Sequence, residues 1–344
     1  MKHFPAPFLT RLLLACLATM LCPRLALAEW LSDEQAIMGT SIHVELWDAD
    51  HADGEAAIAA VMAEMHRIDR SMSPFIETSE LSLINREAAL HPVAISQEMF
   101  DLITRSLEFS KLTNGAFDIT FSSVGYLYDY RRHIKPTEAE IQRALPGIDY
   151  RHIILDGEHR TIRFVRPGMR IDLGGIAKGH AVDNCVELLK KRGITHALVT
   201  AGGDSRIMGD RRGRPWMIGI RDPRRKDGVV AMLPLSDTAV STSGDYERYF
   251  KVDGVRYHHI INPKTGHSAS EVHSATIIAP TATTTDGLSK TAFVLGPEKA
   301  MAIIESLKDV EAVIVDKNGR LLYSRGLRRP ASQTPVSGTT RPQP

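Results

Sequence analysis

Apolar side chains recur every three or four residues in several stretches of the chain, a pattern that predicts amphipathic helices. One of these helices covers residues 57–68, and another begins at its capping residue Ser96 and ends at Asn114-Gly115. Thr137 and Glu140 form a capping-box pattern at the start of a short helix. The other predicted helices cover residues 79–85, 283–295 and 297–307, together with a helix that opens with Lys178 and stops at Gly193.

Apolar runs bounded by short polar turns predict strands between these helices. Residues 161–165 and 169–173 flank Pro167-Gly168, so we expect them to pair as a hairpin. Residues 312–315 and 321–324 should close a second hairpin. The other predicted strands are 41–47, 196–200, 216–220, 229–235, 239–241, 246–252, 255–261 and 274–279. This mixture favours an α+β fold of mostly antiparallel sheets with packed helices.

The first 28 residues have the pattern of an export signal. Lys2 and Arg11 give a positive start, residues 12–21 are apolar, and Ala26-Leu27-Ala28 is a small-residue cleavage site. Cys16 loosely resembles a lipid-attachment site, but very few apolar residues precede it. We therefore expect an exported, periplasmic protein that is cleaved after residue 28, in preference to a lipid-anchored one.

The rest of the chain is expected to form one domain over residues 29–327. Pro, Ser, Thr and Arg dominate residues 328–344, so this tail is expected to be disordered. Lys plus Arg number 42 against 41 Asp plus Glu, so no overall basic field indicates nucleic-acid binding. No apolar run after the signal is long enough to span a bilayer. Cys185 is the one cysteine of the mature chain and is expected in the core.

The stretch from Arg170 to Asp183 combines an acid, a double-glycine turn and a lysine at a helix start. Gly174 and Gly175 leave room for a ligand beside the backbone, and the helix start and Lys178 attract anions. The alternative is a tight strand-to-helix turn with a solvated lysine. Similar small, polar, glycine-containing turns occupy residues 113–118, 201–204, 241–244 and 259–266. Together they favour a long polar ligand gripped by backbone groups.

The order of short motifs along the chain resembles that of the FAD:protein FMN transferase (ApbE) family. These motifs are Met-Gly-Thr, Met-Ser near Ser-Glu, Gly-Ala-Phe-Asp, Asp-Leu-Gly-Gly-Ile-Ala-Lys-Gly, Gly-Gly-Asp, Ser-Thr-Ser-Gly, His-Ile-Ile-x-Pro-x-Thr-Gly, and Asp-x-Leu before Phe-Val-Leu-Gly. The resemblance covers residues 30–325. It implies one two-lobed catalytic domain related to the tunnelling fold, bound FAD, and a magnesium ion. It also implies transfer of FMN, with release of AMP, to a threonine hydroxyl of an exported or membrane-bound electron-transfer protein.

The resemblance assigns the FAD contacts to the glycine turns and their surroundings. The matching positions are Met38, Phe75, Gly115, Ala116, Phe117, Asp118, Asp172, Gly174, Gly175, Lys178, Gly203, Asp204, Ser243 and Ile260. Met38 would serve equally well as a core residue. Phe75 stands where the family has a tyrosine, so a ring is retained for stacking and a hydroxyl contact is lost. Lys178 is expected to neutralise phosphate charge during phosphoryl transfer.

His259 is the candidate general base, since it matches the histidine of the family's His-Ile-Ile-Asp-Pro stretch. A threonine hydroxyl is a poor nucleophile unless a base takes its proton. Asn262 replaces the aspartate of that stretch, which removes a charge. The alternative role for His259 is a strand histidine hydrogen-bonded to backbone. Its neighbour His258 should face the opposite way on the strand.

The resemblance places magnesium at the Ala177 carbonyl and Asp286. Lys290 stands where the family has a threonine that also helps to hold the metal, and an ammonium has no lone pair to give. Three outcomes are open. Water replaces the threonine, Lys290 pairs with Asp286 and itself neutralises the phosphates, or Lys290 bends into solvent.

Two other functions would use the same pocket. An FAD pyrophosphatase would give the phosphoryl group to water and release FMN and AMP. A non-catalytic exported flavin-binding protein would leave FAD unchanged. The sequence alone leaves these alternatives open beside flavin transfer.

Overall fold

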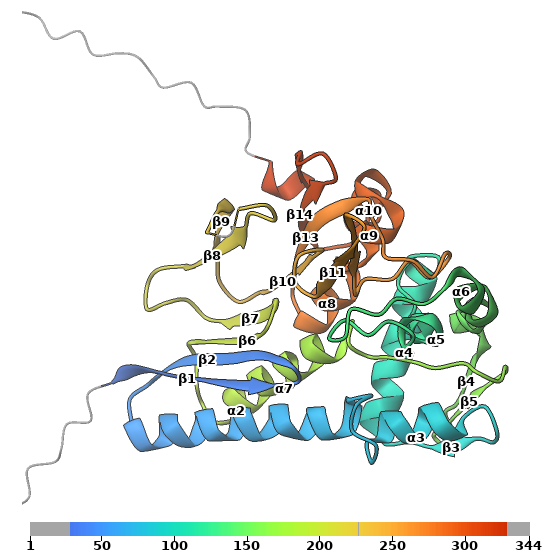
Figure 1. Cartoon of the computed structure of the whole chain (residues 1–344). Helices are drawn as coiled ribbons and strands as arrows, with labels where there is room; N and C mark the ends of the chain where they lie inside the picture. The colour runs from blue at the N-terminus through green and yellow to red at the C-terminus, as the bar shows by residue number, and fades with distance from the viewer. Residues whose placement is uncertain (1–27, 226, 329–344) are drawn as a thin grey trace, which may run out of the picture.

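The computed structural model describes residues 28–225 and 227–328 (Figure 1). The predicted signal, except for its last residue, and the predicted tail, except for its first, lie outside this range. Among the described residues, no helix combines the length and apolar character needed to cross a membrane.

An eight-stranded sheet organises the fold, with strand order β1-β2-β6-β7-β10-β13-β14-β15. Its strands are β1 (Glu29–Ile37), β2 (Thr40–Asp48), β6 (Ala197–Ala201), β7 (Asp204–Met208), β10 (Ala239–Gly244), β13 (Val272–Ala279), β14 (Glu311–Asp316) and β15 (Leu321–Tyr323). Every neighbouring pair is antiparallel. Ile42, Val44 and Leu46 of β2 alternate with more exposed residues and are fully buried. The expected α+β class with antiparallel sheets is confirmed.

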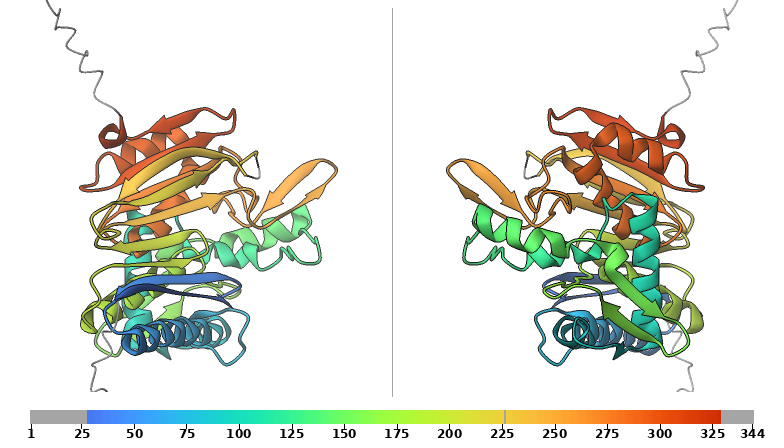
Figure 2. Two further views of the ribbon diagram at one scale, coloured as in Figure 1. Left: turned by 90° about the vertical axis from the view of Figure 1, so that its left-hand side faces the viewer. Right: turned by 90° about the vertical axis from the view of Figure 1, so that its right-hand side faces the viewer.

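Five helices form one layer against this sheet (Figure 2). They are α2 (His51–Met72), α7 (Ala177–Lys191), α8 (Ala282–Ser289), α9 (Thr291–Leu295) and α10 (Pro297–Ile304). α2 packs on β1 and β2, α7 on β6 and β7, α8 on β10 and β13, and α10 on β14. Each helix also contacts the next, from α2 through α7, α8 and α9 to α10. The predicted helix over residues 57–68 is therefore the buried face of a longer helix, α2.

The remaining elements flank this body, with the β8–β9 hairpin on the side opposite α3 to α6 (Figure 1). They are α3 (Glu80–Glu87), α4 (Gln97–Leu112), α5 (Ser122–Gly125), α6 (Glu138–Ala144), β3 (Val93–Ala94), β4 (Ile153–Asp156) and β5 (Thr161–Phe164), and the hairpins β8 (Trp216–Arg221) with β9 (Val229–Leu235) and β11 (Tyr249–Val252) with β12 (Val255–His258). α5, α6 and the β11–β12 hairpin project together from the body (Figure 2). A second small core, built on Val124, Tyr128, Ile141 and Ile261, joins them.

The structure corrects two sequence predictions and adds one strand that the pattern missed. Residues 169–173 form no strand, because a side chain and distant backbone take their hydrogen bonds. The Asn85 amide bonds the main-chain N–H and carbonyl of Ile171, and the main-chain N–H of Asp172 donates to the Ile119 carbonyl. β5 pairs with β4 and β3 instead. The pattern missed β1, a polar edge strand with few apolar residues. The single helix expected over residues 283–295 divides into α8 and α9 at Lys290.

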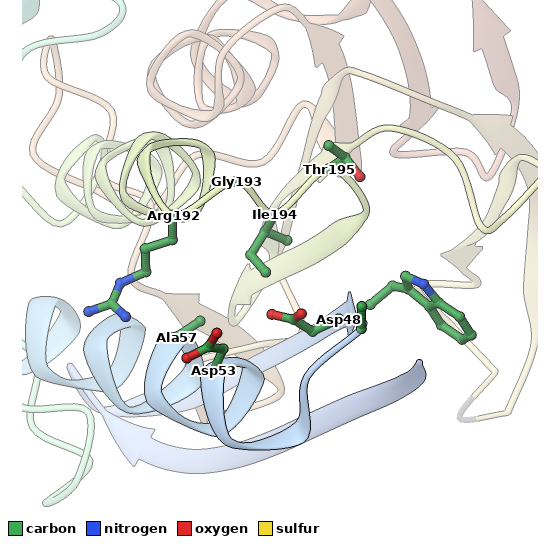
Figure 3. Close-up of a pocket in the computed structure, with 9 residues that line it drawn as sticks. Asp48, Asp53, Ala57, Arg192, Gly193, Ile194 and Thr195 are labelled. Carbon is green, nitrogen blue, oxygen red and sulfur yellow. The ribbon is translucent and has the colours of Figure 1, made fainter. Parts of the chain in front are cut away.

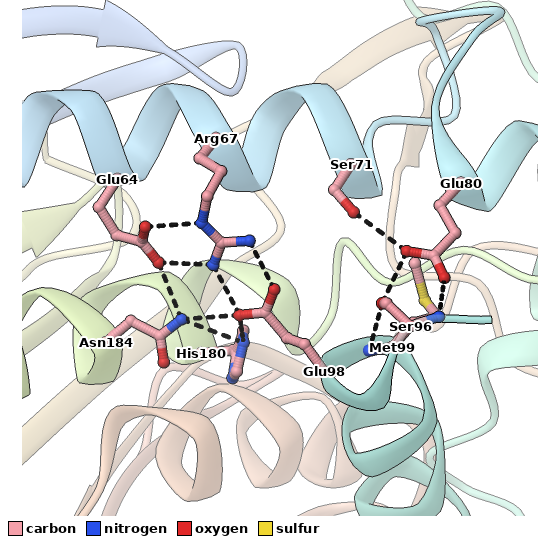
Figure 4. Close-up of polar contacts among 9 residues, drawn as sticks. All are labelled: Glu64, Arg67, Ser71, Glu80, Ser96, Glu98, Met99, His180 and Asn184. Atoms are coloured by element: carbon pink, nitrogen blue, oxygen red, sulfur yellow. Dashed lines mark hydrogen bonds and ion pairs between the residues drawn. The ribbon is translucent and has the colours of Figure 1, made fainter. Parts of the chain in front are cut away.

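A polar cluster joins α2, α4 and α7 (Figure 4). Arg67 of α2 donates to both carboxylate oxygens of Glu98 at 2.7 and 2.8 Å and also to Glu64 of its own helix. His180 and Asn184 of α7 each lie 2.9 Å from the same oxygen of Glu98. The bonds from His180 and Arg67 hold the pKa of Glu98 well below its ordinary value. Because charge-assisted bonds are the strong ones, the cluster fixes the first turns of α7 against α2 and α4.

Candidate functional site

Four charged side chains meet where the starts of α7 and β7 face α8. Lys178 Nζ lies 3.0 Å from Asp204 Oδ2 and 3.3 Å from Asp286 Oδ2. Lys290 Nζ bonds Asp286 Oδ1 and, at 2.9 Å, the main-chain carbonyl of Asp286. We call these four residues the charge cluster. Its members all came from the sequence prediction, and of the three outcomes considered for Lys290 the structure shows the pair with Asp286.

The lysines keep one buried carboxylate of the charge cluster ionised. Asp286 is fully buried, and burial alone raises its pKa, but the ammonium groups of Lys178 and Lys290 outweigh burial and hold that pKa below the ordinary value. Burial and the nearby Asp286 carboxylate raise the pKa of Asp204. Two negative and two positive groups thus balance in a space with little water, where ion pairs are strong.

Close packing of α7 on α8 sets the geometry of the charge cluster. A Cβ at Gly179 would lie 2.2 Å from the Ala282 carbonyl oxygen, so glycine permits main chain to touch main chain. The Gly179 N–H donates to Asp286 Oδ2 at 3.1 Å. One turn further along α7, Asp183 accepts hydrogen bonds from the first N–H groups of α8, Ala282 N at 2.9 Å and Thr283 N at 2.8 Å. A carboxylate at a helix start is a stabilising cap.

The double-glycine turn runs directly into this cluster. The Lys178 ammonium donates to the Gly174 carbonyl at 3.0 Å, and the Gly174 N–H donates to Asp172 at 2.6 Å. Burial raises the pKa of the Asp172 carboxyl, although this N–H bond opposes the rise. At Gly175, an added Cβ would stand 3.4 Å from the Phe117 ring and 3.9 Å from Lys290 Cε. The structure therefore brings the predicted turn, Phe117 and Lys290 together.

The Asp118 carboxylate of the Gly-Ala-Phe-Asp stretch holds local structure, a role that the motif did not predict. Asp118 Oδ1 accepts from Thr120 N at 2.8 Å, and Asp118 Oδ2 accepts from Tyr150 N at 3.0 Å. Its carboxylate therefore caps a 3-10 turn, Ile119–Phe121, and is buried. Gly115 has a φ of 75°, which suits glycine at the end of α4, and Ala116 is buried.

Hydroxyl groups line the contact between β10 and α8. Ser243 Oγ lies 2.8 Å from Ser289 Oγ, and Ser241 Oγ lies 2.6 Å from Thr285 Oγ1. All four residues are buried. Ser243 was predicted from its motif, whereas Ser241 and its partners on α8 were missed, because their meeting depends on the packing of two distant segments.

Met38 lies in the tight turn between β1 and β2, opposite a second glycine turn. Met38 and Gly39 have φ values of 55° and 67°, the left-handed conformation that two-residue hairpin turns require. Such a φ is unfavourable for methionine and marks local strain. Met38 also packs against the main core. Gly203 is equally constrained, because a Cβ there would stand 2.4 Å from the Thr242 carbonyl oxygen.

Arg248 connects this turn to the candidate base and was missed by the sequence analysis. Its Nη2 donates to the Gly39 carbonyl at 2.9 Å, and its own carbonyl accepts from His259 N at 3.1 Å. Its charge also lowers the pKa of His259. No local signal identifies Arg248, since an arginine before a strand is common on protein surfaces.

The two adjacent histidines differ in burial and in hydrogen bonding, and the strand expected over residues 255–261 ends at His258. His258 is buried, its Nε2 lies 2.5 Å from the Ala269 carbonyl, and its Nδ1 accepts from Ile260 N at 3.3 Å. His259 is partly exposed, and its buried Nδ1 has no hydrogen-bond partner among residues 28–225 and 227–328. Burial, together with positive groups that include Lys290 and Lys178, lowers the pKa of His259 to about 3. The ring is therefore neutral at ordinary pH and keeps one nitrogen without a hydrogen-bond partner in the described part of the chain.

The remaining predicted residues lie in different surroundings. Phe75 is 91% exposed in the loop between α2 and α3, so its ring is accessible for a stacking contact. Ile260 is a buried core residue, and Ala177 is the buried first residue of α7. A separate surface pocket is lined by residues of β2, α2 and the segment after α7, among them Asp53 and Arg192 (Figure 3). It contains none of the predicted site residues, so the candidate site rests on the charge cluster instead.

Comparisons with known proteins cover nearly the whole described chain. The sequence model of the ApbE family matches residues 38–314, a span that includes every candidate site residue. A Treponema pallidum protein named FAD:protein FMN transferase is 32% identical over 315 residues, covering 86% of this chain and 87% of its own length. A Vibrio cholerae protein of the same name is 33% identical over 279 residues, covering 78% of this chain and 82% of its own.

Solved structures agree with these sequence matches. The crystal structure of the ApbE protein from Thermotoga maritima aligns with a TM-score of 0.80 at 35% identity and covers 87% of this chain and 98% of that one. The flavin transferase ApbE from Vibrio cholerae aligns with a TM-score of 0.78 at 29% identity and the same coverage. From sequence and fold together, the chain belongs to the ApbE family.

Proposed function

We propose that this protein transfers FMN from FAD to a threonine hydroxyl of a target protein and releases AMP. The observation that carries the proposal is the unpartnered nitrogen of His259, which lies within electrostatic range of Lys178 and Lys290. Membership of the ApbE family and relatives named FAD:protein FMN transferase support a protein acceptor. They favour transfer over FAD hydrolysis and over flavin binding without turnover.

In the proposed reaction, the threonine oxygen bonds to the phosphorus of the FMN half as the bond from that phosphorus to the bridging pyrophosphate oxygen breaks. His259 accepts the threonine proton, and AMP leaves with the bridging oxygen. Phosphoryl transfer of this kind depends mainly on positioning and on neutralisation of charge. Lys178 and Arg248 are two of the positive groups proposed to offset the phosphate charge.

The magnesium ion implied by the resemblance fits these residues poorly. Magnesium requires oxygen ligands in octahedral geometry, whereas both carboxylate oxygens of Asp286 already accept from nitrogen donors. Lys290 also brings an ammonium to the position of the expected threonine ligand. The steps above therefore use only the protein's own charges.

Incubation of the mature protein with FAD and an acceptor protein of one of the relatives named FAD:protein FMN transferase tests the proposal. FMN covalently attached to the acceptor supports transfer. Free FMN and AMP with an unmodified acceptor indicate a pyrophosphatase, and unchanged FAD indicates a binding protein. Either of the last two results contradicts the proposal.

FAD is expected to bind at least about tenfold more tightly than riboflavin or FMN. Lys178 and the glycine turns suit the pyrophosphate, and each charge-assisted hydrogen bond that riboflavin cannot form weakens its binding by about that factor. Titration of the flavin-free protein with each compound, followed by flavin fluorescence, measures the difference. Equal affinity for riboflavin and FAD would show that the phosphates are not bound.

The protein is expected to act after export to the periplasm, on an acceptor of an exported or membrane-bound electron-transfer system. The sequence pattern predicts cleavage after Ala28 with no lipid attached. The intact mass of the exported protein measures this directly. A mass that corresponds to a lipid-modified Cys16 at the new N-terminus would contradict it.

A further inference from the structure

Each oxygen atom of Asp286 accepts at least one hydrogen bond from a nitrogen donor of this chain. Oδ1 and the main-chain carbonyl both accept from the Lys290 ammonium. Oδ2 accepts from Gly179 N at 3.1 Å and from Lys178 Nζ at 3.3 Å. A cation that coordinated Asp286 would have to share each oxygen with a donor already bound to it, and at Oδ1 that donor is the Lys290 ammonium.

The Lys290 ammonium is held in this position by the fold. The side chain is 16% exposed, so it is largely removed from the solvent into which a free lysine would extend. Lys290 lies between α8 and α9, four residues after Asp286, a spacing that brings the two side chains to one face. Its stem passes beside Gly175, where a Cβ would be 3.9 Å from Cε. The ammonium is therefore placed next to the turn proposed to receive the FAD phosphates.

The charge balance of the site also opposes a second cation. Lys178 and Lys290 together neutralise Asp204 and Asp286. A divalent ion added here would meet a cluster that is already neutral, because the attraction of the two carboxylates is offset by the repulsion of the two ammonium groups. An ammonium also offers such an ion no lone pair.

We propose that the Lys290 ammonium takes the place of a divalent cation, so that this protein binds FAD and transfers FMN without magnesium. The inference about transfer rests on the proposed function, whereas the exclusion of metal rests on the contacts of Asp286 and on the charge balance of the cluster. Lys290 supplies one fixed positive charge beside the phosphates, and Lys178 supplies a second. Neither lysine changes its covalent state.

Metal binding tests the exclusion directly. The full chain is treated with a chelator, and Mn²⁺, whose free ion gives a strong electron paramagnetic resonance signal, is titrated as a probe of the magnesium position. Wild type is expected to bind Mn²⁺ at least about tenfold more weakly than Lys290→Thr, which restores an oxygen ligand. The control Lys308→Thr, which removes an exposed lysine outside the charge cluster, should behave as wild type. Equal Mn²⁺ affinity in wild type and Lys290→Thr, or no binding by either, would overturn the assignment.

FAD affinity in the presence of chelator gives an independent measurement. Lys290→Thr is expected to bind FAD about tenfold more weakly than wild type and to recover when Mg²⁺ is added. Lys290→Met removes the charge without adding an oxygen, so its affinity should fall similarly and should not recover. A tenfold gain of wild-type affinity on Mg²⁺ addition would overturn the proposal. Failure to modify any acceptor would count against the proposed function, while both binding measurements would still decide the role of Lys290.

Discussion

Replacement of His259 by alanine is expected to slow FMN transfer by about 100-fold or more, the usual contribution of a general base, with little change in FAD affinity. The threonine hydroxyl needs a group to take its proton, and the buried Nδ1 of His259 has no hydrogen-bond partner within the described part of the chain, so the ring keeps an unused hydrogen-bonding position. Transfer rate and FAD affinity of the variant, measured separately, check both statements. The exposed histidine His91 offers a matched control, since His91→Ala should retain full activity.

The low pKa of His259 also predicts the pH dependence of the reaction. Burial and the charges of Arg248, Lys290 and Lys178 keep the pKa of the ring at about 3, so the free protein holds it neutral at ordinary pH. Bound FAD brings phosphate charges that raise this pKa and make the ring a stronger base. The value of kcat/KM, which reports the free protein, should show no loss from His259 protonation between about pH 5 and 8. Wild-type transfer by His259→Ala would return His259 to a structural role, whereas an acid limb near pH 6.5 that the variant lacks would show that the pKa of the ring is not low in the free protein.

Replacement of Lys178 by methionine should be more damaging, because two buried carboxylates lose their shared partner. Lys178 lies 3.0 Å from Asp204 and 3.3 Å from Asp286. Breaking a buried pair of this kind costs about 3 to 5 kcal/mol of folding free energy. The lost positive charge should also slow transfer by about 100-fold to 1,000-fold. Chemical denaturation and the transfer assay measure the two effects.

A second substitution separates the two roles of Lys178. Lys178→Met combined with Asp204→Asn removes one charge of each sign, so stability should largely return while transfer remains slow. Recovery of transfer in the double variant would show that Lys178 acts on the fold alone. A single variant with wild-type stability would show that the Lys178 ion pairs contribute little.

The elements that the sequence predicted well are those with local signals. Ser79, Ser96 and Thr137 begin helices α3, α4 and α6 because a side-chain oxygen caps nearby N–H groups, an interaction within three residues. β1 was missed, and the strand predicted over residues 169–173 was wrong. Both structures depend on distant partners, the neighbouring strand for β1 and Asn85 for residues 169–173.

The same distinction holds for the site. Lys178, Asp286 and Lys290 were found through motifs, but their mutual distances required the contact between Gly179 and Ala282 that brings α7 onto α8. Arg248 and Asp183 were not identified as site residues, because each acts through main-chain groups that lie far away in the sequence. Asp118 matched its motif, but its carboxylate caps a turn, a role that the motif alone did not reveal.

The central claim is tested most directly by the products of one reaction, counted together. FAD is incubated with the wild-type protein, a chelator, and an acceptor protein of one of the relatives named FAD:protein FMN transferase. AMP, free FMN and acceptor-bound FMN are quantified over time. The account predicts one AMP for each FMN bound to acceptor threonine, with negligible free FMN. AMP matched by free FMN, with the acceptor unmodified, would contradict it.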